Sequence, residues 1–337
     1  MSRLTAAVIG CGDISAVHTA AIKKMDDVDL VGFCDSDDIR LAVATSAHDV
    51  SGYADHLSLL DALKPDVVHI TTPHSSHSTI AIDCLERGVN VVLEKPLAHT
   101  LEEAQRLVAA ASVSTAKIAV CFQNRYNAAV QAMRATLDSG EVGDIKGASA
   151  TVFWQRDANY YRNRPWRGKW ETAGGGLMMN QAIHTVDLLQ WLVGDVVSLS
   201  GNSSTRFLGD SIEVEDTAEF VAVHENGARS AFYATLANAV NAPITLDIVT
   251  ERATLSLRGG LTITYADGRV EVIPERRGSS GQRAYWGVSH ELLIADFYDR
   301  LTKADSFWIN PGEAMKSLRI IKELYRQSYP LKSETVA

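Results

Sequence analysis

The sequence is poor in cysteine and has no long apolar run. Its four cysteines are Cys11, Cys34, Cys84 and Cys121, which lie in or beside apolar segments and form no CxxC pair. We therefore expect buried, reduced thiols and no metal site, because structural zinc needs closely spaced Cys or His ligands. No stretch of about 18 apolar residues is present, so no membrane span is expected. The run Leu4–Ile9 is too short for a signal peptide, which favours a cytoplasmic protein.

An excess of positive charge is also missing. The chain has 32 Lys and Arg against 41 Asp and Glu, and its net charge is −9. This balance gives no general electrostatic reason to bind nucleic acid or an anionic membrane. What remains is the ordinary composition of a globular protein, with 46% hydrophobic and 22% charged residues in 337 positions. That length predicts about two domains.

Two kinds of sequence segment alternate over the first 120 residues. Short β-branched runs predict buried parallel strands at Leu4–Ile9, Leu30–Cys34, Val67–Thr71, Val89–Leu93 and Ile118–Val120. Longer amphipathic stretches predict crossover helices at Ile14–Lys24, Ile39–Ala47, Leu57–Leu63, Thr79–Arg87 and Leu101–Ala111. The alternation predicts right-handed βαβ units in a doubly wound parallel sheet, which forms a first domain over residues 1–121.

The second domain, residues 122–337, is predicted to be α+β. Helical periodicity marks Asn127–Ser139, Leu177–Leu192, His290–Leu301 and Pro311–Gln327. Alternating segments predict strands at Gly147–Gln155, Val196–Ser203, Ala218–His224, Ala228–Leu236, Thr245–Val249, Ala253–Arg258, Leu261–Tyr265 and Arg269–Ile273. Asn-Gly, Gly-Gly and Asp-Gly turns between these strands favour a large, mainly antiparallel sheet.

A glycine motif follows the first strand and opens a helix. It reads Gly10-Cys11-Gly12-Asp13-Ile14-Ser15, with serine in place of the third glycine of GxGxxG. Gly10 permits a tight turn, and Gly12 lets a pyrophosphate approach the backbone at the helix N-terminus. The alternative is a glycine-rich turn without a ligand. The order strand, glycines, helix favours dinucleotide binding through Gly10, Gly12, Asp13 and Ile14.

An acidic residue at the end of the second strand bears on the choice of cofactor. Asp35 is placed to accept hydrogen bonds from the adenosine ribose hydroxyls. Asp37 and Asp38 follow it, and the three carboxylates would repel the 2′-phosphate of NADP. Arg40 is the only nearby cation. We therefore expect NAD, with NADP less favoured. Asp37 and Asp38 also suit the acidic first turn of the next helix.

Lys95 lies just past the carboxyl end of a predicted central strand, where open α/β sheets bind ligands. A partly desolvated lysine at that place can exchange protons, although a single lysine there is more often a solvated surface charge.

The order of motifs resembles the Gfo/Idh/MocA oxidoreductase family over nearly the whole chain. The resemblance rests on Thr-Pro-x-x-x-His at 72–77, Gly-x-x-Val-x-x-Glu-Lys-Pro-Leu-Ala at 88–98, Arg125, and Gly174-Gly175-Gly176 followed by Asn180, His184 and Asp187. It implies a Rossmann domain followed by a domain with an open sheet. It also implies NAD(P)-dependent oxidation of a secondary alcohol on a sugar, cyclitol or related compound, in a homodimer or homotetramer assembled through that sheet.

The resemblance assigns roles to residues of both domains. His184 would be the base that takes the hydroxyl proton, and Lys95 a proton relay on the same hydroxyl. On a helix, Asn180, His184 and Asp187 would share one face. Many relatives have Asp at position 180; Asn180 cannot accept a proton, so it would orient the substrate. The pair Asn180-Gln181 resembles family members that act on sugar C3.

Further cofactor contacts are expected from the segments that carry the family motifs. They are Thr71, Thr72, Pro73, His77, Glu94 and Lys95. His77 suits capping or packing better than catalysis, and Glu94 could hold the local backbone or pair with Lys95.

Aromatic and basic residues are concentrated between positions 154 and 170. Aromatic faces bind the apolar faces of sugar rings, and arginines hold hydroxyls, carboxylates or phosphates. The predicted substrate contacts are Asn180, Arg125, Trp154, Arg156, Tyr161, Trp166 and Arg167. The arginines suggest a uronate or nucleotide sugar without excluding a neutral glycoside. The alternative is an aromatic patch that anchors a long loop or a subunit interface.

Two other functions stay open. One is an enzyme that uses tightly bound NAD transiently and returns the hydride to its product. The other is a non-catalytic NAD-binding regulator, against which the presence of both Lys95 and His184 argues.

Overall fold

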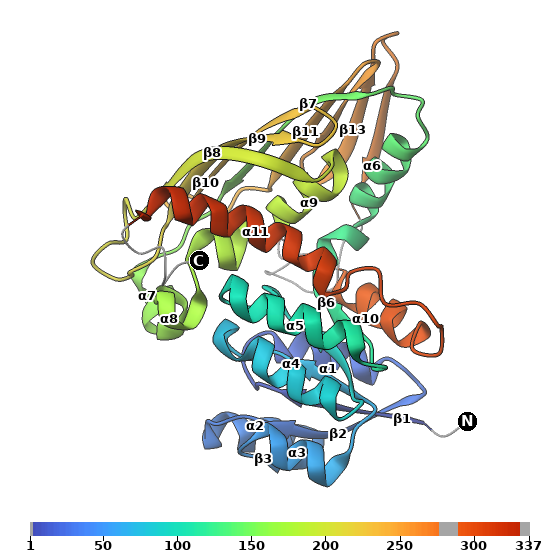
Figure 1. Cartoon of the computed structure of the whole chain (residues 1–337), viewed down its shortest axis with the longest axis vertical. Helices are drawn as coiled ribbons and strands as arrows, with labels where there is room; N and C mark the ends of the chain where they lie inside the picture. Colours follow the sequence, from blue (N-terminus) through green and yellow to red (C-terminus); the bar gives the residue numbers. More distant parts are fainter. Residues whose placement is uncertain (1–2, 276–288, 331–337) are drawn as a thin grey trace. The chain divides into compact units, whose positions relative to one another are not determined.

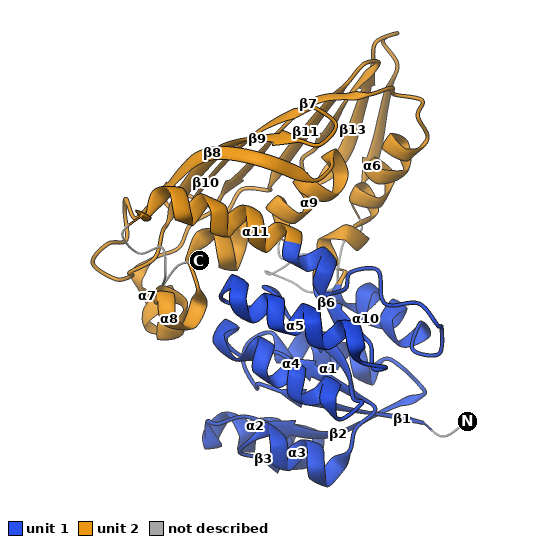
Figure 2. Cartoon of the chain, in the orientation of Figure 1, with its two compact units in different colours: residues 1–121, 290–315 blue, residues 122–289, 316–337 orange. Residues whose placement is uncertain are grey.

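The chain folds into two compact units in a computed structural model that describes residues 3–275 and 289–330. Unit 1 comprises residues 1–121 and 290–315, and unit 2 comprises residues 122–289 and 316–337 (Figure 2). The division at residue 121 is the one expected from the sequence. Residues 290–315, which were expected in the second domain, instead fold with the first. The second crossing between the units falls within the helix α11 (Pro311–Ser328).

Unit 1 contains a six-stranded parallel sheet (Figure 1). The strand order is β3-β2-β1-β4-β5-β6, as in a doubly wound sheet, so the predicted Rossmann architecture is confirmed. The strands are β1 (Leu4–Ile9), β2 (Val28–Cys34), β3 (Ser51–Tyr53), β4 (Val67–Ile70), β5 (Asn90–Leu93) and β6 (Ile118–Val120). β1 and β4 are central and almost wholly buried, which accounts for their continuous apolar runs.

Right-handed crossovers place helices on both faces of this sheet. The helices of unit 1 are α1 (Ser15–Lys23), α2 (Asp38–His48), α3 (His56–Leu63), α4 (His77–Glu86), α5 (Leu101–Val113) and α10 (His290–Asp299). Asp37, Asp55 and Thr100 cap α2, α3 and α5 by accepting hydrogen bonds from backbone N–H groups. α10 comes from the far end of the sequence and packs against α1. Across residues 3–275 and 289–330, no helix has the length and apolarity needed to span a membrane.

Unit 2 contains an eight-stranded sheet in the order β14-β13-β12-β11-β7-β10-β9-β8. The strands are β7 (Ile145–Phe153), β8 (Val196–Ser204), β9 (Thr217–His224), β10 (Arg229–Thr235), β11 (Thr245–Thr250), β12 (Ala253–Leu257), β13 (Gly260–Tyr265) and β14 (Val270–Pro274). All neighbours are antiparallel except β7 and β10, which run parallel. The predicted, mainly antiparallel open sheet is therefore confirmed.

Helices pack on one face of this sheet, and the other face carries exposed side chains. One face buries Phe220, Phe232, Ile248 and Ile263, and α6 (Ala128–Asp138) and α9 (Ile183–Val193) pack on it (Figure 1). The strand registers place the exposed side chains of the central and edge strands together on the opposite face. Its exposed apolar residues are Val221, Tyr233, Val249, Val270 and Val272. Short helices α7 (Ala158–Arg162) and α8 (Trp170–Ala173) follow β7.

Candidate functional site

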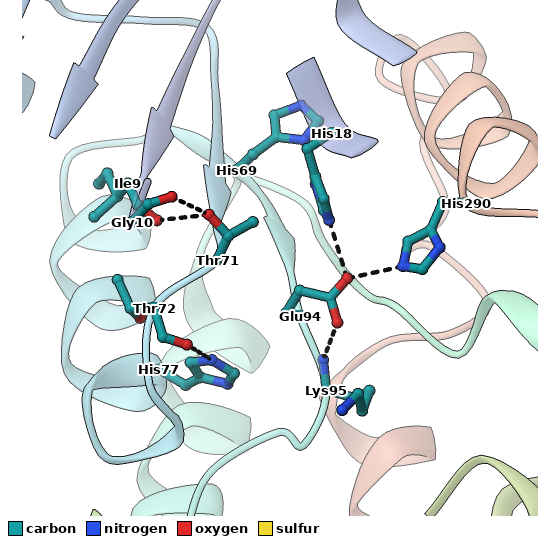
Figure 3. Close-up of polar contacts among 10 residues, drawn as sticks. All are labelled: Ile9, Gly10, His18, His69, Thr71, Thr72, His77, Glu94, Lys95 and His290. Carbon is teal, nitrogen blue, oxygen red and sulfur yellow. Dashed lines mark hydrogen bonds and ion pairs between the residues drawn. The ribbon is translucent and has the colours of Figure 1, made fainter. Parts of the chain in front are cut away.

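The glycine loop of unit 1 has the shape of a dinucleotide cradle. Gly10 has φ +96°, and a Cβ built there would lie 2.7 Å from the carbonyl carbon of Thr71. The Thr71 hydroxyl donates to the carbonyl oxygens of Ile9 (3.1 Å) and Gly10 (2.5 Å) and so fixes the turn (Figure 3). At Gly12 the nearest such atom is 4.0 Å away. Packing within the chain therefore does not require glycine at position 12, whereas the approach of a ligand to the backbone would.

Asp35 joins the end of β2 to this loop. Its carboxylate accepts the N–H groups of Cys11 (2.7 Å) and Asp37 (2.8 Å). Each carboxylate oxygen has a further acceptor site. The structure thus fits the expected group: glycines beside a helix N-terminus, with a carboxylate at the tip of the neighbouring strand.

The only cation expected near that carboxylate is already paired. Asp37 accepts the side-chain Nε and Nη2 of Arg40 at 3.0 and 2.9 Å and also caps α2. Hydrogen bonds from the backbone and side chain of Arg40 hold the pKa of Asp37 below its usual value. The guanidinium is thus occupied by a carboxylate, an arrangement that suits NAD better than the extra phosphate of NADP.

Lys95 is the single half-exposed residue within the otherwise buried segment 91–98. It follows β5, and the Glu94 carboxylate accepts its backbone N–H at 3.2 Å (Figure 3). The fully buried ring of His77 lies between two carbonyl oxygens, those of Pro96 (2.7 Å) and Thr72 (3.0 Å). His77 therefore connects the segment after β4 to the segment after β5, and because its ring exposes no surface, the cofactor contact expected of it is corrected to a packing role.

In unit 2, Glu215 holds the three-glycine segment that precedes α9. Its carboxylate accepts the N–H groups of Gly176 and Met178 at 2.8 Å each and the hydroxyl of Tyr325 at 2.6 Å. A Cβ at Gly176 would lie 2.0 Å from the Glu215 carbonyl oxygen, and one at Gly175 would lie 2.2 Å from the Tyr325 hydroxyl. These close approaches explain the glycines. Burial raises the pKa of Glu215, although its hydrogen bonds act in the opposite direction.

The predicted helix 177–192 begins with a π-helical turn, Met178–Ala182, before α9. Between residues 177 and 190, Asn180 and His184 alone are half-exposed, and the other twelve side chains are buried. Phe122 lies edge-on to the His184 ring, at 6.0 Å between centroids. π turns inside helices are frequent at functional sites. The segment therefore presents one amide and one imidazole from among otherwise buried side chains.

Asp187 and Arg125 differ from their expected places. The Arg125 guanidinium donates to the Asp187 carboxylate through Nε (2.8 Å) and Nη2 (2.7 Å), and both side chains are 1% exposed. Ser317 also donates to Asp187 (3.0 Å), and the guanidinium lies over the Trp191 ring. Both side chains are buried against each other, which corrects the substrate contact predicted for Arg125; Asp187 lies in α9 three residues after His184 but is not exposed with it. The pair binds α9 to the turn after Phe122, because a buried guanidinium requires a counter-charge.

The loop of residues 154–170 divides into a buried and a half-exposed set. Trp154 and Tyr161 are 5% and 3% exposed, and the Trp154 indole N–H donates to the carbonyl of Ala242. Both side chains are packed within the structure, so neither offers a ring face to a sugar. Arg156, Trp166 and Arg167 are half-exposed.

Tyr160 connects this loop to the π turn, a contact that was not predicted from the sequence. Its hydroxyl accepts the side-chain amides of Asn180 (3.2 Å) and Gln181 (3.0 Å). The guanidinium carbons of Arg156 and Arg167 lie 5.0 and 4.4 Å from its ring centroid. The loop therefore reaches the half-exposed Asn180 through Tyr160.

Comparison with known proteins identifies the family of the chain. Residues 4–122 match the family description "Oxidoreductase family, NAD-binding Rossmann fold", and residues 130–256 match "GFO/IDH/MocA C-terminal domain". D-apiose dehydrogenase of Paraburkholderia graminis is 30% identical over 236 residues, which is 68% of this chain and 60% of that protein. D-glucoside 3-dehydrogenase of Escherichia coli is 29% identical over 201 residues, 57% of this chain and 55% of that protein. The chain thus matches somewhat over half the length of these relatives.

A solved structure extends the likeness to the whole chain. The WlbA dehydrogenase from Bordetella pertussis, in complex with NADH and UDP-GlcNAcA, is 29% identical with a TM-score of 0.85, and the match covers 97% of each chain. Both units therefore have counterparts in one dehydrogenase. The chain belongs to the Gfo/Idh/MocA family of oxidoreductases, and its N-terminal part is an NAD-binding Rossmann domain.

Proposed function

We propose that this protein is an NAD-dependent dehydrogenase that oxidises a secondary hydroxyl of a sugar, sugar derivative or cyclitol. The observation that carries the proposal is the exposure of polar groups in two otherwise buried segments. Lys95 is half-exposed between buried neighbours after β5, and Asn180 and His184 are half-exposed between buried neighbours around the π turn. Because these three polar side chains remain accessible while their neighbours are buried, they suit a reacting site in a protein of an oxidoreductase family.

The glycine loop supports the choice of cofactor. Gly10, Gly12, Asp13 and Ile14 would hold the pyrophosphate at the N-terminus of α1, and Asp35 the ribose hydroxyls. Of the remaining predicted contacts, Thr71, Thr72 and Pro73 follow β4, and Glu94 and Lys95 follow β5. Bound NAD supplies the hydride acceptor.

The acid–base chemistry is assigned to two side chains. Neutral His184 takes the proton of the substrate hydroxyl as the adjacent C–H bond breaks, which suits an imidazole near neutral pH. Lys95 donates a hydrogen bond to the same oxygen and relays the proton; in the reverse direction it polarises the ketone. Asn180 cannot take a proton, so its amide orients the substrate, with Tyr160 holding that amide (3.2 Å).

Substrate selection is assigned to the half-exposed part of the 154–170 loop: Tyr160, Trp166, Arg156 and Arg167. The relative named D-glucoside 3-dehydrogenase and the Asn180-Gln181 pair both support oxidation at sugar C3. Guanidinium groups also suit an acidic sugar, and the WlbA dehydrogenase structure contains UDP-GlcNAcA.

Assembly is proposed to use the uncovered face of the unit 2 sheet. Its exposed Val221, Tyr233, Val249 and Val272 form an apolar surface on an open sheet, which homo-oligomers commonly bury. We expect a homodimer or homotetramer; light scattering after gel filtration would give the mass, and Val221→Asp should reduce it.

The test of the activity is NADH formation at 340 nm with NAD and a panel of neutral glycosides, uronates, nucleotide sugars and cyclitols. Lys95→Ala and His184→Ala should lose at least 100-fold in kcat while still binding NADH. Lys23→Ala, an exposed lysine in the last turn of α1, is the matched control. Full activity in both site variants would contradict the assignment. Bound NAD that survives purification, with turnover but no net NADH, would instead identify transient hydride use.

A further inference from the structure

A line of buried polar side chains in unit 1 ends on the carboxylate next to Lys95 (Figure 3). Glu94 Oε1 accepts hydrogen bonds from the Nε2 atoms of His18 (3.0 Å) and His290 (2.9 Å). Its other oxygen, Oε2, accepts the backbone N–H of Lys95 at 3.2 Å. These residues come from α1, α10 and the segment after β5, and Glu94, His18 and His290 are buried.

The line continues behind His18. Its Nδ1 lies 2.9 Å from the Nδ1 of His69, a residue of the central strand β4. The Nε2 of His69 lies 3.0 Å from the hydroxyl of Tyr298 in α10. Both imidazoles are 0% exposed. His18, His69 and Tyr298 carry no signal in the sequence, because they are far apart in the chain and match no motif.

The hydrogen bonds along this line allow only one pair of tautomers for neutral His18 and His69 rings. An ionised Glu94 can only accept, so the Nε2 atom of His18 carries a hydrogen. A neutral His18 then has a bare Nδ1, and the hydrogen between the two facing Nδ1 atoms belongs to His69. The Nε2 of His69 is therefore bare and accepts the hydroxyl hydrogen of Tyr298. Every contact among Glu94, His18, His69 and Tyr298 then has one donor and one acceptor, and Glu94 is the charged member of these four.

Burial favours the same arrangement. It lowers the pKa of His18 and, more strongly, that of His69, so both rings are neutral near pH 7. Burial alone would raise the pKa of Glu94, but the hydrogen bonds from His18 and His290 hold it well below the usual value. Burial also raises the pKa of Tyr298, so its hydroxyl keeps its proton. Other ionisable groups near Glu94 are Cys121, whose pKa burial raises, the buried His77, whose pKa burial lowers, and the adjacent Lys95.

A metal ion is the competing explanation for this cluster. His18, Glu94 and His290 offer ligand atoms within 4.8 Å of one another. A metal would need the Nε2 atoms bare and would move the hydrogen of His18 to Nδ1. The two Nε2 atoms instead lie at hydrogen-bonding distance from the same oxygen, and the hydrogens balance without an ion. The two explanations therefore predict opposite tautomers for His18.

We propose that Tyr298, His69, His18 and His290 form a positioning network that fixes Glu94 as a carboxylate and thereby holds the backbone of Lys95. The network would set where the Lys95 amine is presented, without touching the substrate itself. The consequence for turnover rests on the proposed function of Lys95; the proton arrangement does not.

The first experiment reads the tautomers of the intact protein. In protein labelled with ¹⁵N on histidine, long-range ¹H–¹⁵N spectra at pH 7.5 should show His18 protonated on Nε2 and His69 on Nδ1, assigned with the His18→Gln and His69→Asn variants. Elemental analysis should find no stoichiometric metal. His18 protonated on Nδ1, or one zinc ion per chain lost in His290→Ala, would overturn the proposal.

The second experiment compares two replacements of His69. Asparagine keeps an N–H near the place of Nδ1, whereas leucine has none. With NAD and the best substrate of the panel, His69→Leu should lower kcat about tenfold with the Kd for NADH unchanged, and His69→Asn should recover most of that loss. Equal kcat in both variants and wild type would overturn the positioning role. If the wild type has no dehydrogenase activity, the proposed function fails, and the tautomer spectra still decide the network.

Discussion

Replacing Glu215 by glutamine removes one buried charge at nearly constant side-chain size. The carboxylate receives the Gly176 N–H on Oε2, and the Met178 N–H and the Tyr325 hydroxyl on Oε1. An amide oxygen can keep the second and third of these. The amide nitrogen of the variant would then face the Gly176 N–H, so that two donors oppose each other in a buried place.

The cost follows from these contacts. A hydrogen bond to a charged group contributes about 1.5–3 kcal/mol, and a buried donor left unsatisfied costs about 1–3 kcal/mol. Burial raises the pKa of Glu215, so the ionised wild type carries a desolvation cost that the amide avoids and that offsets part of the loss. We expect the free energy of unfolding to fall by roughly 2 kcal/mol. Glu215 holds the start of the π turn that carries Asn180 and leads into His184 of α9, so kcat should fall about 10- to 100-fold.

Urea unfolding followed by tryptophan fluorescence measures the stability of Glu215→Gln, and the 340 nm assay measures its kcat. Glu213→Gln is the matched control, because Glu213 is exposed two residues away. The folded state binds a proton on Glu215 more tightly than the unfolded state, so the stability of the wild type over the variant should shrink as pH rises above about 4.5. Wild-type stability and kcat in Glu215→Gln would show that the charge of Glu215 does not hold this turn.

Three further changes test other parts of the structure. Because the folded-state pKa of Glu94 is lowered, this group stabilises the wild type above the unfolded pKa, and the stabilisation is lost as pH falls through the folded pKa. Urea titrations between pH 7 and 3 should therefore show a smaller loss of stability at low pH in Glu94→Gln than in the wild type. Asp187→Asn removes the charge opposite the buried Arg125 and should lower the free energy of unfolding by about 3–5 kcal/mol in the same assay. Gly10→Ala would bring a Cβ within 2.7 Å of the Thr71 backbone at a positive φ; NADH fluorescence should show at least a tenfold weaker Kd.

Most elements of the fold follow from periodicity, and the exceptions have physical causes. β3 (Ser51–Tyr53) was missed because it has three residues, one of them glycine, and none of them is buried. The parallel pairing of β7 with β10 depends on chain topology, which local alternation does not encode. α10 was found, but its packing in unit 1 follows from contacts with α1 that no local pattern announces.

The candidate site divides in the same way. Motif residues such as Gly10, Lys95 and His184 could be located, because glycine motifs, strand ends and family motifs can be recognised in the local sequence. The partners that hold them could not: Tyr160 reaches Asn180 from 20 residues away, and Glu215 reaches Gly176 from 39. Glu215 carried no local signal, because it lies outside the predicted strands and matches no motif.

Hydride transfer to NAD can be followed with a substrate that carries deuterium at the oxidised carbon. With the active sugar or cyclitol identified from the panel, the wild type should move the label to the nicotinamide ring of NAD. Lys95→Ala and His184→Ala should do so at least 100-fold more slowly while binding NADH normally. Substrate conversion without any label on the nicotinamide in single-turnover samples would exclude hydride transfer, and transfer at the wild-type rate in both variants would exclude the roles of Lys95 and His184.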